Sequence, residues 1–262
     1  MSAKLANHHG GWVRQEPDSR DLRFAHEELR SPPGSFSLNA YGMLSPHVWD
    51  QGQLGSCTAH GTGELLVIAR RRGVAAPFVP NWQRPARLFL YYNTRSLEGT
   101  VDEDAGAVIR DAVKAAKQWG VPHEAWCPYK IEDFASKPSA KAYERAVKYE
   151  DIVYQSVDQS EAAIRTAVSS GLPVVFGFDV YESFESEEVA LSGEMPMPKP
   201  GEQLLGGHCV CIVGYSPDGY ECRNSWGEGW GAGGYFTMPA DYLFSDRCSD
   251  FWVIDSDGAS SG

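Results

Sequence analysis

The chain has 262 residues, enough to bury the core of one large domain or of two lobes folded together. Its 35 acidic and 23 basic residues give a formal net charge of -12 at pH 7, which argues against nucleic acid as a partner. No segment resembles a signal peptide or approaches the roughly 20 apolar residues of a membrane span. We expect no membrane association, and a protein that is either cytoplasmic or exported by a leaderless route.

Residues 1–35 are polar and end in SPPG, and we interpret them as an extended leader segment rather than a domain. Helices are predicted from Cys57 to a stop at Gly73, over GAVIRDAVKAAKQW before Gly120, and over SEAAIRTAVSSG. From LPVVFGFDV onward the pattern changes to short strands, in GGHCVCIVGYS, GYECRNSW and GGYFTMP. A helix-rich first half and a strand-rich second half predict an α+β protein of two lobes with a cleft between them.

Cys57 follows a Gly-Ser step in WDQGQLGSCTAHG, where the first helix is expected to begin. Unpaired backbone N–H groups and the positive end of the helix dipole stabilise a thiolate at such a position. The alternative is an inert buried cysteine. The glycines at 61 and 63 weaken the helix itself, so we expect them to allow close approach of a neighbouring element.

His208 lies in LLGGHCVCIVGY and Asn224 in CRNSWGEGWGAGGYF, on two strands that can pair as a hairpin. A histidine can take the proton of a thiol and return it to a leaving amine, and an asparagine amide can orient the imidazole. The alternatives are a strand histidine satisfied by hydrogen bonds and an asparagine in a turn.

Together DQGQLGSCTA, GGHCVCIVGY and RNSWGEGWGAGGYF resemble papain-like cysteine peptidases, in the chain order Cys, His, Asn, and WGVPHEAWCPY and GLPVVFGFDVYESF extend the resemblance. It implies a papain-like two-lobed fold over residues 36–255, followed by a disordered tail over 256–262. The short leader and the phrase PDSRD are similar to bacterial members of the family, and the family's helical prodomain is missing.

The resemblance also assigns roles. Cys57 resembles the nucleophile, His208 the general base and acid, and Asn224 the orienting amide. Gln51 resembles the side chain that forms an oxyanion hole with the Cys57 backbone N–H. Trp226 resembles the indole that shields the hydrogen bond between histidine and asparagine.

Substrate-binding positions follow less directly from the resemblance. Gly106 and Ala107 lie near the family's glycine pair that binds substrate backbone, and Gly207 and Trp226 are placed beside them. Two positions depart from the family pattern. Thr58 replaces an aromatic residue, and Leu54 replaces a cysteine, so one familiar disulfide cannot form.

No metal and no cofactor are expected. Strand alternation places His208 on one face and Cys209 with Cys211 on the other, so one ion could not bind all three, and the two cysteines are expected in the core. Six cysteines are too few for a disulfide scaffold, so most should be thiols. The sequence leaves open whether three further cysteines form disulfides: Cys127, Cys222 and Cys248.

The acidic run ESEEVALSGEMPMPKP is interpreted as a solvated loop, with a mobile flap over the cleft as the alternative. The leader is expected to bind along the domain and partly cover the site, with a disordered terminus as the alternative. Its proposed contacts are four apolar anchors and three arginines that pair with the acidic domain: Trp12, Val13, Leu22, Phe24, Arg14, Arg20 and Arg23.

The resemblance thus implies a cysteine peptidase, an endopeptidase or an aminopeptidase-type hydrolase, that cleaves peptide bonds through a thioester. It would act as a monomer on peptide or protein substrates, with its own N-terminal segment as an intramolecular inhibitor. Acyl transfer to an amine, or cleavage of an isopeptide or γ-glutamyl bond, would use the same site. A non-catalytic binding protein on the same scaffold is the remaining alternative.

Overall fold

The computed structural model of the chain describes residues 10–24, 32–72 and 84–256. The helices and strands follow in chain order: β1 (Phe36–Ser37), α1 (Cys57–Arg72), α2 (Arg87–Glu98), α3 (Ile109–Trp119), α4 (Ala140–Ala146), β2 (Ile152–Ser156), α5 (Glu161–Ser169), β3 (Val174–Tyr181), α6 (Glu187–Ser192), β4 (Leu204–Ser216), β5 (Gly219–Arg223), β6 (Tyr235–Met238), α7 (Ala240–Leu243) and β7 (Cys248–Ser256). Short 3-10 helices span Glu124–Trp126, Ile131–Asp133 and Val147–Tyr149.

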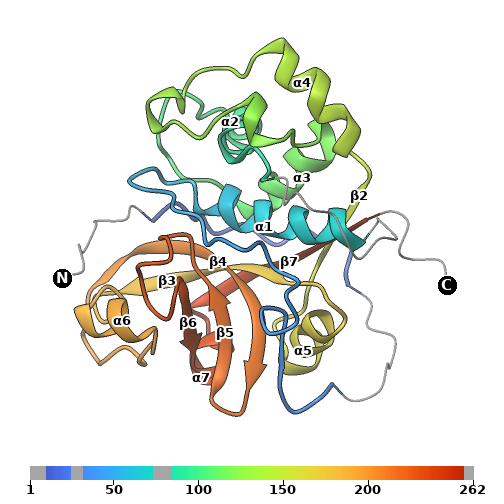
Figure 1. The fold of residues 1–262 in the computed structure, drawn as a ribbon. Helices are drawn as coiled ribbons and strands as arrows, with labels where there is room; N and C mark the ends of the chain where they lie inside the picture. Colours follow the sequence, from blue (N-terminus) through green and yellow to red (C-terminus); the bar gives the residue numbers. More distant parts are fainter. Residues whose placement is uncertain (1–9, 25–31, 73–83, 257–262) are drawn as a thin grey trace.

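The elements form two lobes on either side of α1 (Figure 1). Helices α2, α3 and α4 lie together on one side, and the sheet with α5, α6 and α7 lies on the other. The sheet has the order β2-β7-β3-β4-β5-β6, with β1 paired to β4 and all pairs antiparallel. The α+β class and the strand-rich second half are confirmed.

Helix α1 is packed on all sides, because its glycines leave room for neighbouring side chains. A Cβ at Gly61 would lie 2.8 Å from Cγ2 of Val175 on β3, and one at Gly63 would lie 3.2 Å from the Trp49 ring. Any larger residue at Gly61 would therefore push the helix away from the sheet. The close approach expected at these glycines is present.

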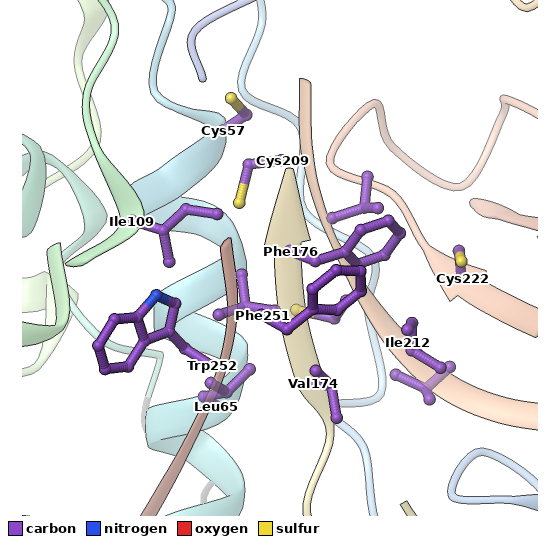
Figure 2. Close-up of a cluster of buried hydrophobic side chains, with 14 of the residues drawn as sticks. Cys57, Leu65, Ile109, Val174, Phe176, Cys209, Ile212, Cys222, Phe251 and Trp252 are labelled. Carbon is purple, nitrogen blue, oxygen red and sulfur yellow. The ribbon is translucent and has the colours of Figure 1, made fainter. Parts of the chain in front are cut away.

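The core continues along α1 away from Cys57 (Figure 2). Cys57 lies at the end of the helix, with Cys209 of β4 beside it, and the aromatic side chains lie further along. Phe176 and Phe251 stack with ring centroids 5.1 Å apart, and Trp252 is fully buried. This packing fixes α1 against the sheet and therefore fixes where its first residue lies.

One expectation needs correction, and one long helix has no counterpart in the sequence analysis. The acidic run is not only a solvated loop, because α6 forms within it: Val189 and Ala190 are buried, and Ser186 Oγ accepts a hydrogen bond from the Val189 N–H. Helix α2 was not predicted, because it buries polar residues such as Asn93 and Arg95 and so lacks a regular polar face. The expected stop at Gly73, and the tail beyond residue 256, lie outside the described residues.

Across the described ranges, no helix is both long and apolar enough to cross a membrane. All six cysteines, including Cys127, Cys222 and Cys248, are free. Cys209 and Cys211 are buried in the core as expected.

A buried ion pair joins α1 to β5. Nε of Arg223 lies 3.3 Å from Oε1 of Glu64, and both side chains are almost fully buried. The Ser45 hydroxyl donates to the Glu64 carboxylate at 2.9 Å, and Arg223 donates to the His47 carbonyl at 2.6 Å. Burial raises the pKa of Glu64, although Arg223 and Ser45 act in the opposite direction. The pair fixes the position of α1 relative to β5. Each buried charge would be costly without the opposite charge beside it.

We predict that Glu64→Leu lowers the free energy of unfolding by about 3–5 kcal/mol, because it leaves a buried guanidinium without its counter-charge. Chemical denaturation would measure the change. The double variant Glu64→Leu with Arg223→Met should recover much of the loss. Lys141→Ala, which removes a solvent-exposed pair with Glu144, should change stability by less than about 1 kcal/mol. Equal losses in the single and double variants would contradict this account.

Candidate active site

Cys57 is the first residue of α1 and has no exposed surface. The backbone N–H groups of Cys209 and Thr58 face its sulfur. Cys209 directly follows His208 on β4, so the packing of α1 on the sheet brings the thiol to the strand that carries the histidine. The geometry places a potential nucleophile against the strand that carries a potential base.

His208 and Asn224 lie side by side, as expected. Nε2 of His208 and Oδ1 of Asn224 are 2.8 Å apart, and both residues are buried. Trp226 stacks on the imidazole, with ring centroids 4.7 Å apart and an interplanar angle of 26°. The indole covers the imidazole that makes this hydrogen bond, and the bond fixes the orientation of the ring.

Gln51 is buried, and both ends of its amide are held. Nε2 donates to the Leu54 carbonyl at 2.9 Å, and Oε1 accepts from the Ser225 hydroxyl at 2.5 Å. The two contacts settle the amide orientation and leave one N–H of Nε2 for a further acceptor. The Gln51 backbone N–H donates to the Ser225 carbonyl at 2.9 Å, so the residue is tied to the segment that follows Asn224.

Sequence reasoning missed Tyr129, which fixes the loop before α1. Its hydroxyl donates to the Gln51 carbonyl at 2.9 Å and lies 2.6 Å from the Ser56 hydroxyl. It also missed Asp104, whose carboxylate accepts from the Gly55 N–H at 3.0 Å. Neither residue belongs to a local pattern that marks it, because each acts on a loop far away in the chain.

Residues 10–24, which we call the strap, cross the site between the lobes. The Ala107 N–H donates to the Gly11 carbonyl at 2.7 Å, and the Val13 N–H donates to the Ala107 carbonyl at 3.0 Å. On the other side, the Trp12 N–H donates to the Gly207 carbonyl at 3.3 Å. Two of the predicted substrate-binding residues, Ala107 and Gly207, thus hold the backbone of the chain's own N-terminal segment.

The strap fits at this point because glycines meet there. A Cβ at Gly11 would lie 1.9 Å from the Gly55 carbonyl oxygen, and one at Gly10 would lie 2.5 Å from the Gly207 oxygen. Gly106 has φ of 72°, and a Cβ there would lie 2.4 Å from the Gly11 oxygen. No larger residue at position 11 can lie this close to the loop before Cys57.

Further along the strap, the main anchor is Arg110 of α3. Its Nε and Nη2 donate to the Asp21 carboxylate at 3.0 and 2.6 Å, and its Nη1 donates to the Glu16 carbonyl at 2.8 Å. The Phe24 N–H then donates to the Ser156 carbonyl at 2.8 Å. The PDSRD phrase, residues 17–21, therefore lies in the segment that a buried arginine holds.

The expected strap contacts are only partly correct. Val13 and Leu22 are 44% and 63% exposed and do not act as apolar anchors. Arg20 pairs with Asp18 inside the strap rather than with the domain. The remaining predicted contacts are made: Trp12 is buried, Phe24 packs on the core, and Arg14 and Arg23 lie 3.6 and 3.3 Å from Asp179 and Asp158.

Burial raises the pKa of the Cys57 thiol to about 12, and the N–H groups of Cys209, Gly11 and Thr58 offset this only in part. Under the strap the sulfur is therefore protonated at neutral pH. Loss of water at the sulfur outweighs the stabilising effect of the helix N-terminus. Within the described residues, no group of histidine, cysteine and carboxylate side chains could hold a metal ion.

Comparisons with known proteins agree on one family. The sequence model for the papain family cysteine proteases matches residues 100–249, more than half of the chain. A peptidase C1-like protein of Acanthamoeba polyphaga mimivirus is 35% identical over 97% of this chain and 89% of its own length. Cysteine proteinase 2 of Entamoeba histolytica is 28% identical over 79% of this chain and 63% of its own. The crystal structure of xylellain, a cysteine protease from Xylella fastidiosa, superposes with a TM-score of 0.86 and 33% identity, over 94% of this chain and 96% of xylellain.

We predict that alkylation of Cys57 by iodoacetamide is slow at pH 7 and that its rate rises about tenfold per pH unit up to pH 9. Only the thiolate reacts, and the pKa of the thiol lies above this whole pH range. Gly11→Val should displace the strap and raise the rate at pH 7 at least about tenfold. Gly34→Val is the control, since a Cβ there meets nothing within 4 Å. An unchanged rate in Gly11→Val would show that the strap is not what buries the sulfur.

Proposed function

The chain belongs to the papain family of cysteine proteases and is a cysteine peptidase, and we propose that Cys57, His208 and Asn224 are its catalytic residues. The observation that carries this proposal is the convergence of three distant segments. The thiol at the start of α1 lies against β4 next to His208, whose Nε2 is 2.8 Å from the Asn224 amide oxygen.

In the proposed reaction, His208 takes the proton from Cys57, and the thiolate sulfur attacks the carbonyl carbon of the peptide bond. The imidazolium then gives the proton to the leaving amine as the C–N bond breaks, and a thioester remains. His208 next takes a proton from water, whose oxygen attacks the thioester carbon. The C–S bond breaks, the acid is released, and the imidazolium returns the proton to the Cys57 sulfur. Asn224 keeps the imidazole in one orientation through both steps.

Gln51 is proposed to bind the oxyanion of the tetrahedral intermediate, together with the backbone N–H of Cys57. A useful donor must already be fixed before charge develops. The contacts to Leu54 and Ser225 hold the Gln51 amide in this way, and Tyr129 holds the loop between the two donors. The arrangement needs little reorganisation during the reaction.

We infer that the strap is an intramolecular inhibitor. Its backbone occupies the hydrogen-bonding edge of Ala107 and Gly207, which a substrate in the same cleft would need, and it excludes water from Cys57. Since the strap and the domain belong to one chain, the strap binds at a high effective concentration. Peptide and protein substrates would compete for the same edge only when the strap opens.

Gln51→Ala should lower kcat for a peptidyl aminomethylcoumarin by about 10²- to 10³-fold with little change in KM, because one oxyanion donor is lost. Alkylation of Cys57 should keep its wild-type rate, since that reaction forms no oxyanion.

Cys57→Ala should abolish turnover with its thermal transition intact, and an epoxysuccinyl inhibitor should label Cys57 alone. Turnover by Cys57→Ala would make the assignment wrong.

Asp21→Asn should raise both hydrolysis and Cys57 alkylation by about tenfold, because the strap loses its charged partner for Arg110. Arg20→Gln removes a pair that lies within the strap and should leave both rates unchanged. Both variants keep the full chain, so the domain is tested in the form described. Equal rates in wild type and Asp21→Asn would contradict an inhibitory strap.

A further inference from the structure

The peptide group between Leu54 and Gly55 is held by hydrogen bonds on both sides. Its carbonyl oxygen accepts from Nε2 of Gln51 at 2.9 Å, and its N–H donates to both carboxylate oxygens of Asp104 at 3.0 Å. Leu54 and Gly55 are buried, so neither polar end of the group can turn to water without cost. One peptide group therefore lies between the Asp104 carboxylate and the side-chain amide of Gln51.

Asp104 is itself fixed by helix α2, although the residue is exposed on its other side. The Tyr91 hydroxyl donates to Oδ1 of Asp104 at 2.5 Å. Burial raises the pKa of Tyr91, and the Asp104 carboxylate raises it further, so the hydroxyl stays a donor at neutral pH. Arg95 is fully buried and donates to the carbonyl oxygens of Val101 and Glu103 at 2.8 Å, which holds the loop that carries Asp104. The carboxylate is therefore a preorganised acceptor.

The carboxylate controls the orientation of the peptide group. A peptide group next to glycine rotates at low cost, because glycine accepts a wide range of backbone angles. Rotation here would point the Leu54 oxygen away from Gln51 and leave the amide with one of its two described contacts, the one to Ser225. An ionised acceptor makes a strong hydrogen bond to the Gly55 N–H, and hydrogen bonds in a chain strengthen one another. The orientation of the Gln51 amide thus depends on a residue in a different loop.

We propose that Asp104 is a positioning residue of the oxyanion hole, acting on Gln51 through the Leu54–Gly55 peptide group. The inference rests on the proposed function, in which Gln51 is an oxyanion donor. A donor contributes most when its direction is set before charge develops on the substrate oxygen. Asp104 supplies this by holding the group to which the Gln51 amide is bonded.

The test compares kcat and KM of full-length variants for a peptidyl aminomethylcoumarin. Asp104→Ala should lower kcat about tenfold with little change in KM, because the Gly55 N–H loses its acceptor and the Gln51 amide is less well fixed. Asp104→Asn keeps a neutral acceptor oxygen and should lower kcat less than about threefold. Asp102→Ala is the matched control, since it removes one exposed carboxylate from the same loop, and it should leave both constants unchanged.

Two further measurements separate positioning from a purely structural role. Alkylation of Cys57 forms no oxyanion, so its rate in Asp104→Ala should stay within about twofold of wild type. In a Gln51→Ala background, Asp104→Ala should change kcat less than about twofold, because the proposed effect passes through the Gln51 side chain. An alkylation rate that falls or rises in parallel with kcat would overturn the proposal, and so would losses in the double variant that simply multiply.

The outcomes also distinguish this inference from the proposed function. If Gln51→Ala lowers kcat as expected while Asp104→Ala behaves like Asp102→Ala, the oxyanion role of Gln51 stands and the role of Asp104 is wrong. Equal losses in Asp104→Ala and Asp104→Asn would also overturn the inference, because the acceptor oxygen would not be what matters. If Gln51→Ala itself leaves kcat unchanged, the proposed oxyanion hole is wrong and this inference fails with it.

Discussion

The close packing of α1 against β3 and β4 is the constraint on which the site depends. Cys57 is useful only if its sulfur meets the strand that carries His208, and that distance is set by how near the helix lies to the sheet. Gly61 permits the contact with Val175, and the aromatic core further along the helix maintains it. The backbone N–H of Cys209 then faces the sulfur. A larger residue at 61 would separate the proposed nucleophile from the strand that carries the proposed base, without touching Cys57 or His208.

Beneath the site, buried polar side chains of α1 and α2 pair with one another. Nη1 of Arg87 lies 2.8 Å from Nε2 of His60, and Nδ1 of His60 lies 3.0 Å from the Ser56 carbonyl. A histidine that accepts from an arginine on one side and donates on the other is neutral, and burial lowers its pKa well below the usual range. From its place in α1, His60 therefore supports the loop before Cys57. It is not a second proton carrier.

The strap changes the chemistry of the thiol by removing water. A helix N-terminus stabilises a thiolate by a modest amount, whereas complete burial of a charged sulfur is far more costly. The same residue is thus a protonated core thiol under the strap and a candidate nucleophile once the strap has left. Glycines on both surfaces allow this, because the strap backbone can lie in contact with the loop at Gly55 and the strand at Gly207.

The sequence by itself determined the features that depend on short-range periodicity and on chain order. These include the helix beginning at Cys57, the alternation that separates His208 from Cys209, and the order Cys, His, Asn that carries the family resemblance. Only the tertiary structure decided which surfaces meet. Asp250 has no local signal as a partner for Trp12, and Tyr129 has none as a support for Gln51, because the residues of each pair are far apart in the chain. The partners that Trp12 meets, the exposure of Val13 and the helix within the acidic run follow from packing free energy summed over such distant contacts, which no local pattern records.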